Sequence, residues 1–350
     1  MTINKTEKFE KVFNKFTSSK KINEGILFVE NTSGEFSFMK GYGKKELSSP
    51  FLMASITKLL TTTCILILLE QDKLSLEDRI VKFLDINILK KVHIYKGREY
   101  SYELTVSDLL FQTSGLPDVY LEGKNCLINR VIQEDFHMHF CDTVSRVKKL
   151  KPHFEPRKKG KAYYADINFD ILGEIVEKES GLTLCKAYEK YIFEPLGLVS
   201  TYLPENRDDE IPKIYYKNQI IHRPKFVMSS GASGGCITTA QELMIFIKAF
   251  FGGELFNKSI FGRLSTYNKL QASMGPIHYG GGYMQIPLSG LISLYMGKGE
   301  LVGHSGSTGS FAFYYPIKDL FFVGDLNQMA AASLPIKLSI QFAMVANRIF

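Results

Sequence analysis

Residues 51–70 have the sequence FLMASITKLLTTTCILILLE, in which a short polar turn leads into a stretch that is apolar on every side. A helix that is apolar all round packs at the centre of a domain. We therefore expect residues 54–70 to form a buried helix. Lys58 is the only charged side chain between Ala54 and Leu69, and a buried lysine is costly unless it is paired or functional.

Ser55 lies three residues before Lys58, so the two side chains share one face of the expected helix. A serine hydroxyl becomes a nucleophile when a nearby base takes its proton, and a desolvated lysine can be that base. The free N–H groups at a helix start can bind the developing oxyanion. The tetrapeptide S-x-x-K is common by chance, and the alternative is a capping serine beside a surface lysine. The apolar context favours the catalytic interpretation.

The segments around this helix predict an α+β fold. Strand-like patterns occur on both sides of a long helix-rich middle, at residues 25–29, 36–39, 282–286, 310–315 and 320–324. Helical patterns occupy residues 6–17, 240–251 and 331–348, and the capping boxes at Ser75–Asp78 and Thr105–Asp108 predict two further helix starts. We expect an antiparallel sheet built from both chain ends and flanked by terminal helices.

This pattern also predicts two lobes. Residues 1–75 and 225–350 would form one discontinuous α/β lobe, and residues 76–224 would form a helical lobe. The active site would then lie between them.

Two further segments carry polar groups suited to the chemistry of Ser55. Tyr164 precedes a helical pattern at 171–177, and the triplet His304-Ser305-Gly306 precedes the strand at 310–315. A tyrosine can shuttle a proton beside the serine. A strand edge after the triplet can align a substrate and supply a second oxyanion N–H.

Taken in order, five stretches resemble the class C β-lactamase-like superfamily of penicillin-binding serine hydrolases. They are Phe51 to Lys58, Leu109 to Pro117, Tyr164 to Gly173, Gly234 to Thr239, and Gly303 to Gly306. The superfamily includes class C β-lactamases, D-alanyl-D-alanine carboxypeptidases, D-aminopeptidases and related esterases. The resemblance runs from about residue 22 to residue 330, and it implies a β-lactamase/DD-peptidase-like fold.

The resemblance implies a role for each matched residue. Ser55 would be the nucleophile, Lys58 its lysine partner, and Tyr164 the general base or proton relay. The triplet at 304–306 would stand for the third motif of the family, and the backbone N–H groups of Ser55 and Ser307 would form the oxyanion hole.

Two positions depart from the family pattern. Asp166 stands where the family usually has Asn, and a carboxylate only accepts hydrogen bonds whereas an amide also donates them. We infer that Asp166 pairs with Lys58 or favours a substrate that carries an amine. His304 stands where a lysine is common, and a mostly neutral histidine attracts a substrate carboxylate less strongly.

The expected function is hydrolysis of a small ester, amide or D-amino-acid peptide through a Ser55 acyl-enzyme. A true β-lactamase or a D-alanyl-D-alanine carboxypeptidase remains an alternative among enzymes. A catalytically silent ligand-binding or sensor module on the same scaffold is the alternative from another class, since Asp166 could lock Lys58 in an ion pair.

The composition limits the classes of partner that we expect for this protein. The chain has 350 residues and a formal net charge of +7, carried in short scattered clusters that indicate a solvated surface, not a nucleic-acid site. The pair His137 and His139 lacks further metal ligands, and Gly280–Gly282 lacks a βαβ context. We expect no metal and no cofactor, only a small-molecule or peptide substrate, and we leave the oligomeric state open.

The cysteines and the N-terminus bear on location. The five cysteines form no CxxC pair, which favours a reducing compartment. Residues 1–8 are polar and lack the apolar core of a signal peptide, and no run of about 18 apolar residues is present. The sequence as given predicts a cytoplasmic protein with no membrane span.

Overall fold

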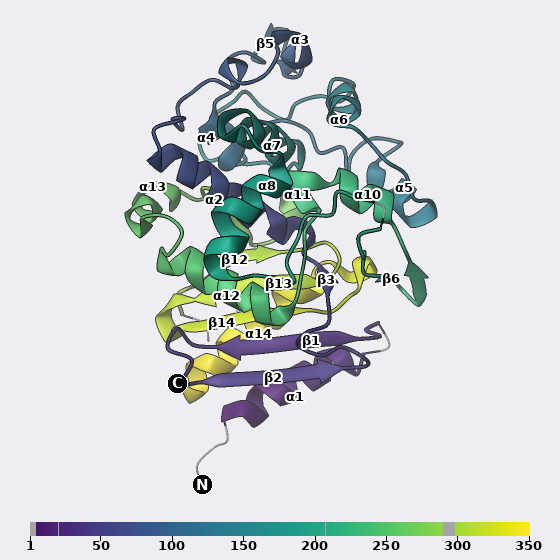
Figure 1. The fold of residues 1–350 in the computed structure, drawn as a ribbon, viewed down its shortest axis with the longest axis vertical. Coiled ribbons are helices and arrows are strands. Elements are labelled where there is room, and N and C mark those ends of the chain that lie inside the picture. Colours follow the sequence, from purple (N-terminus) through teal and green to yellow (C-terminus); the bar gives the residue numbers. More distant parts are fainter. Residues whose placement is uncertain (1–4, 20, 207, 290–297) are drawn as a thin grey trace.

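The computed structural model describes residues 5–19, 21–206, 208–289 and 298–350. The fold is α+β, with a large antiparallel sheet at one end of the molecule and a group of helices at the other (Figure 1). The first and last strands of the chain lie side by side in this sheet, because β1 (Gly25–Glu30) pairs with β14 (Leu320–Asp325). The prediction that both chain ends build one antiparallel sheet is therefore confirmed.

The sheet has eight strands in the order β2-β1-β14-β13-β12-β11-β10-β9. The remaining strands are β2 (Ser37–Tyr42), β9 (Asn268–Lys269), β10 (His278–Tyr279), β11 (Met284–Pro287), β12 (Glu300–Ser305) and β13 (Ser310–Tyr315). Every residue of β14 is buried. A strand in the middle of a covered sheet needs apolar side chains on both faces, which explains the unbroken apolar run at 320–323.

Helices cover both faces of this sheet. Helix α1 (Lys5–Thr17) and helix α14 (Leu334–Ile349) pack against each other and against the sheet, while α12 (Ala240–Gly252) contacts β1, β13 and β14 (Figure 1). Phe9 of α1 contacts both Phe322 of β14 and Phe342 of α14. The two terminal helices are thus joined to the central strands by a shared aromatic core.

Helix α2 (Thr57–Glu70) is the buried helix that the sequence predicted. All of its residues from Thr57 to Leu68 are buried, and it packs against α7 (Ile167–Ser180), α8 (Leu184–Tyr188) and α11 (Gly231–Gly234). Ser55 lies just before it, in the 3₁₀ turn η1 (Ala54–Ile56). The serine is therefore on the turn that enters the helix, not on the helix itself.

Shorter elements complete the helical part and connect it to the sheet. The helices are α3 (Ile86–Leu89), α4 (Val106–Leu110), α5 (Leu127–Gln133), α6 (Phe140–Val147), α9 (Glu194–Leu196), α10 (Pro224–Ser229) and α13 (Phe261–Leu264). Three small two-stranded sheets pair β3 (Phe51–Leu52) with β8 (Ile237–Thr238), β4 (Ile94–Tyr95) with β5 (Arg98–Glu99), and β6 (Ile214–Tyr216) with β7 (Gln219–Ile221).

One local prediction was wrong, and one strand was not predicted. The capping box at Ser75–Asp78 starts no helix: the Asp78 carboxylate accepts from the Ser75 N–H at 2.9 Å and closes a turn, and only a 3₁₀ turn follows at Ile80–Lys82. The similar box at Thr105 does cap α4. Strand β12 was not predicted, because it is buried along most of its length and lacks alternation between polar and apolar residues.

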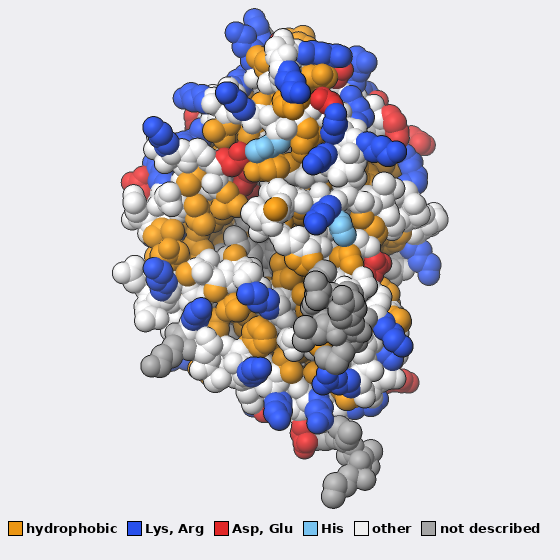
Figure 2. Space-filling view, turned by 180° about the vertical axis from the view of Figure 1, so that it is seen from behind, with side chains coloured by type: hydrophobic (Ala, Val, Ile, Leu, Met, Phe, Trp, Pro, Cys, Tyr) orange, Lys and Arg blue, Asp and Glu red, His pale blue; other side chains and the backbone are white. Residues whose placement is uncertain are grey.

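Two observations concern membranes and metals. Across the ranges that the structure describes, no helix combines the length and apolarity needed to cross a bilayer. Within the same ranges, no group of three or more His, Cys, Asp and Glu side chains could hold a metal ion. Figure 2 shows Lys and Arg side chains scattered over one face of the molecule, separated by neutral and apolar surface.

Candidate active site

Lys58 and Ser55 lie in contact, as the sequence predicted. The Lys58 ammonium is completely buried and has three acceptors around it: the Ser55 hydroxyl at 3.3 Å, the Asp166 carboxylate at 2.7 Å and the Ser233 carbonyl at 2.6 Å. An ammonium has three N–H donors, so this set uses all of them. The expected pairing of Asp166 with Lys58 is present as an ion pair between a buried ammonium and a partly exposed carboxylate.

The backbone before Ser55 is held in an unusual conformation by the turn after β12. Ala54 has a φ of 46°, in the left-handed region that side chains other than glycine rarely adopt. The Ser310 hydroxyl donates to the Met53 carbonyl at 2.8 Å, and Thr308 donates to the Leu52 carbonyl at 3.3 Å. These bonds hold the strained turn that presents Ser55.

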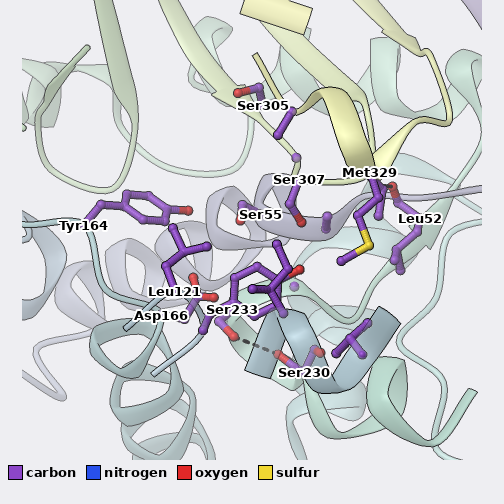
Figure 3. A pocket seen from close by; sticks show the side chains of 18 of the residues that line it. Leu52, Ser55, Leu121, Tyr164, Asp166, Ser230, Ser233, Ser305, Ser307 and Met329 are labelled. Atoms are coloured by element: carbon purple, nitrogen blue, oxygen red, sulfur yellow. Dashed lines mark hydrogen bonds between the residues drawn. The ribbon is translucent and has the colours of Figure 1, made fainter. Parts of the chain in front are cut away.

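Gly306 is part of the same junction. A Cβ at this position would meet the Ser310 hydroxyl and would lie 2.6 Å from the Met53 carbonyl. The absence of a side chain therefore allows the turn after β12 to pack directly on the backbone before Ser55. This contact places Ser305 and Ser307 beside the nucleophile, and Figure 3 shows Ser307 next to Ser55.

Tyr164 points its hydroxyl toward Ser55 (Figure 3). The phenol is buried, and its oxygen has no hydrogen-bond partner among the described residues. Burial raises the pKa of Tyr164 well above its ordinary value, and the Asp166 charge adds to this effect, while the Ser55 hydroxyl opposes it. Tyr164 is therefore a neutral phenol that can give a proton or a hydrogen bond toward Ser55.

The loop that carries Tyr164 is fixed by two glutamines. The Gln271 side-chain oxygen accepts from the Tyr164 N–H at 3.0 Å, and the Gln112 oxygen accepts from the Ala165 N–H at 3.0 Å. Gln112 lies in the second stretch of the resemblance and is fully buried. These contacts hold the loop that brings Tyr164 and Asp166 together from the start of α7.

A second carboxyl group lies beside Asp166. Asp118 is buried, and its oxygen accepts from the backbone N–H groups of Tyr120 at 3.2 Å and Asp166 at 3.4 Å. Burial, with the charge of Asp166 as the second cause, raises the pKa of Asp118 to about 8. Asp118 is thus mainly protonated at neutral pH, and the Lys58–Asp166 pair is left close to electrical neutrality.

His304 does not line the cavity at Ser55, unlike the next three residues, Ser305, Gly306 and Ser307. Its ring is fully buried behind Tyr164, with the two ring centroids 6.0 Å apart. Burial, with the Lys58 charge as the second cause, lowers the pKa of His304 to about 3. The structure thus places this histidine away from the position in which it would meet a substrate carboxylate.

The neutral ring of His304 has a defined tautomer. Its Nδ1 lies 2.9 Å from the Ser305 carbonyl, and a carbonyl only accepts, so Nδ1 carries the hydrogen. Nε2 is then free to accept from the Tyr279 hydroxyl at 3.3 Å. Tyr279 in turn packs edge-on against Tyr164, with centroids 5.8 Å apart. His304 and Tyr279 therefore support Tyr164 from behind.

Ser55, Tyr164 and Asp166 open into one cavity of about 410 Å³. Its wall includes Ser55, Tyr164, Asp166, Ser305 and Ser307, which the sequence singled out. It also includes Asp118, Ser230 and Ser233, which were not predicted from the sequence. Two of these adjoin matched stretches, because Asp118 follows the stretch ending at Pro117 and Ser233 precedes the one starting at Gly234. A serine, a buried ammonium and a phenol at one cavity are suited to acyl transfer.

Solved structures share this fold across almost the whole chain. A D-stereospecific amidohydrolase from Streptomyces sp. superposes with a TM-score of 0.77 and 22% identity, covering 95% of this chain and 97% of that one. EstCE1, described as a hydrolase with promiscuous acyltransferase activity, has a TM-score of 0.80 at 14% identity, with 98% of each chain covered. At these identities the likeness shows the fold alone.

Proteins of similar sequence and a family profile identify the family of this chain. A putative D-alanyl-D-alanine carboxypeptidase of Escherichia coli K12 is 23% identical over 304 residues, which are 77% of this chain and 67% of that protein. Protein flp of Staphylococcus aureus is 27% identical over 241 residues, 64% of this chain but only 44% of that longer protein. The sequence profile of the Beta-lactamase family matches residues 25–338. The chain therefore belongs to the Beta-lactamase family.

Proposed function

We propose that this protein is a serine hydrolase that forms an acyl-enzyme on Ser55 with a small ester, an amide or a D-amino-acid peptide. The observation that carries the proposal is that Ser55 and Tyr164 line one cavity, while Lys58, buried beside it, donates a hydrogen bond to the Ser55 hydroxyl. The relatives described as a carboxypeptidase, an amidohydrolase and a hydrolase with acyltransferase activity support acyl chemistry as the general class.

In the proposed reaction, the Ser55 oxygen attacks the substrate carbonyl and the carbonyl oxygen becomes an oxyanion. The N–H groups of Ser55 and Ser307 would bind that oxyanion. The leaving group departs with a proton, and water then cleaves the acyl–Ser55 ester. Tyr164, a neutral phenol beside the serine, is placed to pass a proton to the leaving group.

Lys58 can accept the serine proton only as a neutral amine, because an ammonium has no lone pair, so it must first give up one of its own protons. The nearest basic acceptor is the Asp166 carboxylate at 2.7 Å. We therefore assign to Asp166 the task of holding this proton while neutral Lys58 takes the one from Ser55. An Asn at this position, as the family usually has, could not play that part.

The cavity walls support the proposed division into two lobes. Asp118, Tyr164 and Asp166 come from the 76–224 range, whereas Ser55 and Ser307 come from the 1–75 and 225–350 ranges. A site between lobes is a common place for a small-molecule pocket.

The proposal is tested by labelling with a fluorophosphonate probe, followed by intact-protein mass spectrometry. We expect a single adduct that maps to Ser55 and is lost in Ser55→Ala. Ser273 lines the same cavity, so Ser273→Ala is the matched control and should still be labelled. A panel of p-nitrophenyl esters, D-alanyl amides and a cephalosporin then identifies the acyl group. Labelling of Ser55→Ala at the wild-type rate would contradict the proposal.

A second candidate function is a catalytically silent binding module, and the saturated ammonium of Lys58 favours it. If the ion pair with Asp166 locks Lys58 in its charged form, the wild type would resist labelling while Asp166→Asn would react. Labelling of the wild type would exclude this candidate.

A further inference from the structure

The cavity at Ser55 has a polar end and a long apolar part. Its polar groups gather around the nucleophile, from Ser55 and Tyr164 to Asp166 and Ser307. Beyond them, the wall consists mainly of large apolar side chains. They are Leu52, Leu121, Ile128, Val131, Ile214, Phe226, Val227, Met274, Ile277, Met284, Met329 and Ile336.

These apolar side chains come from segments far apart in the chain. Ile128 and Val131 lie on α5, Phe226 lies on α10, and Ile336 lies on α14, which supports the sheet. Leu121 belongs to the loop before α5, is 53% exposed, and lies next to Asp166 in Figure 3. Ile128, Phe226, Met274 and Ile336 are also partly exposed. Large apolar side chains that stay partly exposed around a concave site indicate an apolar ligand.

The two cations at this cavity bind groups of the protein. Lys58, buried beside the cavity, is paired with Asp166 at 2.7 Å. Arg223 lies on the wall and donates to the carbonyls of Val131, Ile132 and His222, the first two of which lie in the last turn of α5. Two of its N–H groups thus cap α5, and a third holds the guanidinium against the backbone at His222.

We infer that the substrate is an ester or amide that carries a bulky apolar group, held between Leu121, Phe226 and Ile336 while its carbonyl lies at Ser55. This inference rests on the proposed function of Ser55. It makes a small polar acyl group such as acetyl or D-alanyl a poor substrate, because such a group would leave the apolar part of the cavity filled with water.

The first test measures kcat/KM for p-nitrophenyl esters from acetyl to decanoyl. Burial of each methylene should raise kcat/KM by about fourfold until the chain fills the cavity. A parallel series of acetate esters of ethanol, hexanol and octanol shows whether the apolar group lies on the acyl side or the leaving-group side. A flat profile in both series, or a preference for acetyl with ethanol, would overturn the inference while the Ser55 adduct still stood.

The second test places a charge on each apolar wall. Leu121→Asp and Ile336→Asp change side chains that are partly exposed, so the fold should tolerate them, and thermal unfolding checks this. Each should lower the ratio of octanoyl to acetyl kcat/KM by about tenfold or more. Val199 is 91% exposed and lies outside the cavity wall, so Val199→Asp is the control that leaves this ratio unchanged. An unchanged ratio in both wall variants would contradict the inference.

A third measurement separates failure of the inference from failure of the proposed function. Calorimetry with Ser55→Ala protein compares methyl octanoate with methyl acetate, without any need for turnover. We expect binding of the octanoate alone, with a negative heat-capacity change from apolar burial. If no ester acylates Ser55 but octanoate binds, the proposed hydrolase fails and the apolar site remains. If neither ester binds, the apolar site fails.

Discussion

Replacement of Asp166 by Asn tests the part of the site in which this chain departs from its family. The Lys58 ammonium is fully buried, and its Asp166 partner is 25% exposed at 2.7 Å. Removal of one partner from a fully buried ion pair costs about 3–5 kcal/mol. Asp166 is partly exposed, and the Asn oxygen still accepts one hydrogen bond. We therefore expect Asp166→Asn to lower the free energy of unfolding by about 1–2 kcal/mol.

Asp166→Asn also removes the carboxylate that would hold the Lys58 proton while the neutral amine takes the proton of Ser55. General acid–base catalysis contributes about 10²–10⁴-fold to a rate, so we expect kcat for a p-nitrophenyl ester to fall by about 10²-fold or more in Asp166→Asn. The same substitution should also lower the melting temperature.

Asp78→Asn is the matched control for this experiment. Asp78 pairs with Lys82 at 2.8 Å and is 23% exposed, but it lies outside the cavity wall. Its replacement should leave kcat unchanged. If Asp166→Asn lowers the melting temperature but keeps a kcat near that of the wild type, Asp166 does not hold the Lys58 proton during the reaction.

Three further substitutions test other parts of the site. Tyr164→Phe should lower kcat by about 10²-fold or more with no change in melting temperature, because it removes only the proton donor; a near-normal kcat would exclude this role. Gly306→Ala should lower the free energy of unfolding by about 1–3 kcal/mol in urea titrations, because the added Cβ meets the Met53 carbonyl. An unchanged free energy of unfolding would show that the backbone at Met53 and Gly306 can move apart without cost. Burial raises the pKa of Asp118 to about 8. Between about pH 4 and pH 8 the folded protein therefore holds a proton that the unfolded chain releases. The free energy of unfolding should decline as the pH rises through this range. Asp118→Asn should reduce this decline between pH 5 and pH 9 in thermal unfolding, and an identical decline in both proteins would contradict that origin.

Part of the candidate site could be predicted because its signal is local. Ser55 and Lys58 are three residues apart on one apolar segment, and this spacing survives folding because a helix places such neighbours in a fixed relation. Tyr164 and Asp166 were assigned to the site by the resemblance of their stretch to the family, because no local spacing relates them to Ser55. The pairing of Asp166 with Lys58 followed from charge and from the cost of a buried lysine.

Other parts of the site could not be predicted from the sequence. The Ser233 carbonyl binds Lys58 across 175 positions, and every residue has a carbonyl, so its type says nothing about this contact. His304 was expected to meet the substrate, yet strand β12 turns its ring away from the cavity and behind Tyr164. The strained φ of Ala54 is likewise imposed by the hydrogen bonds of Thr308 and Ser310 from the distant turn.

The amino-acid sequence by itself determined the buried helix at 57–70, the paired strands at both chain ends and the serine–lysine pair. Periodicity, turn residues and the cost of desolvation act over a few neighbouring residues, so they can be followed along the chain. Only the tertiary structure decided the protonated state of Asp118, the position of His304 and the apolar wall beyond Ser55. These depend on burial and on charges brought together from distant segments, and burial is a property of the packed molecule.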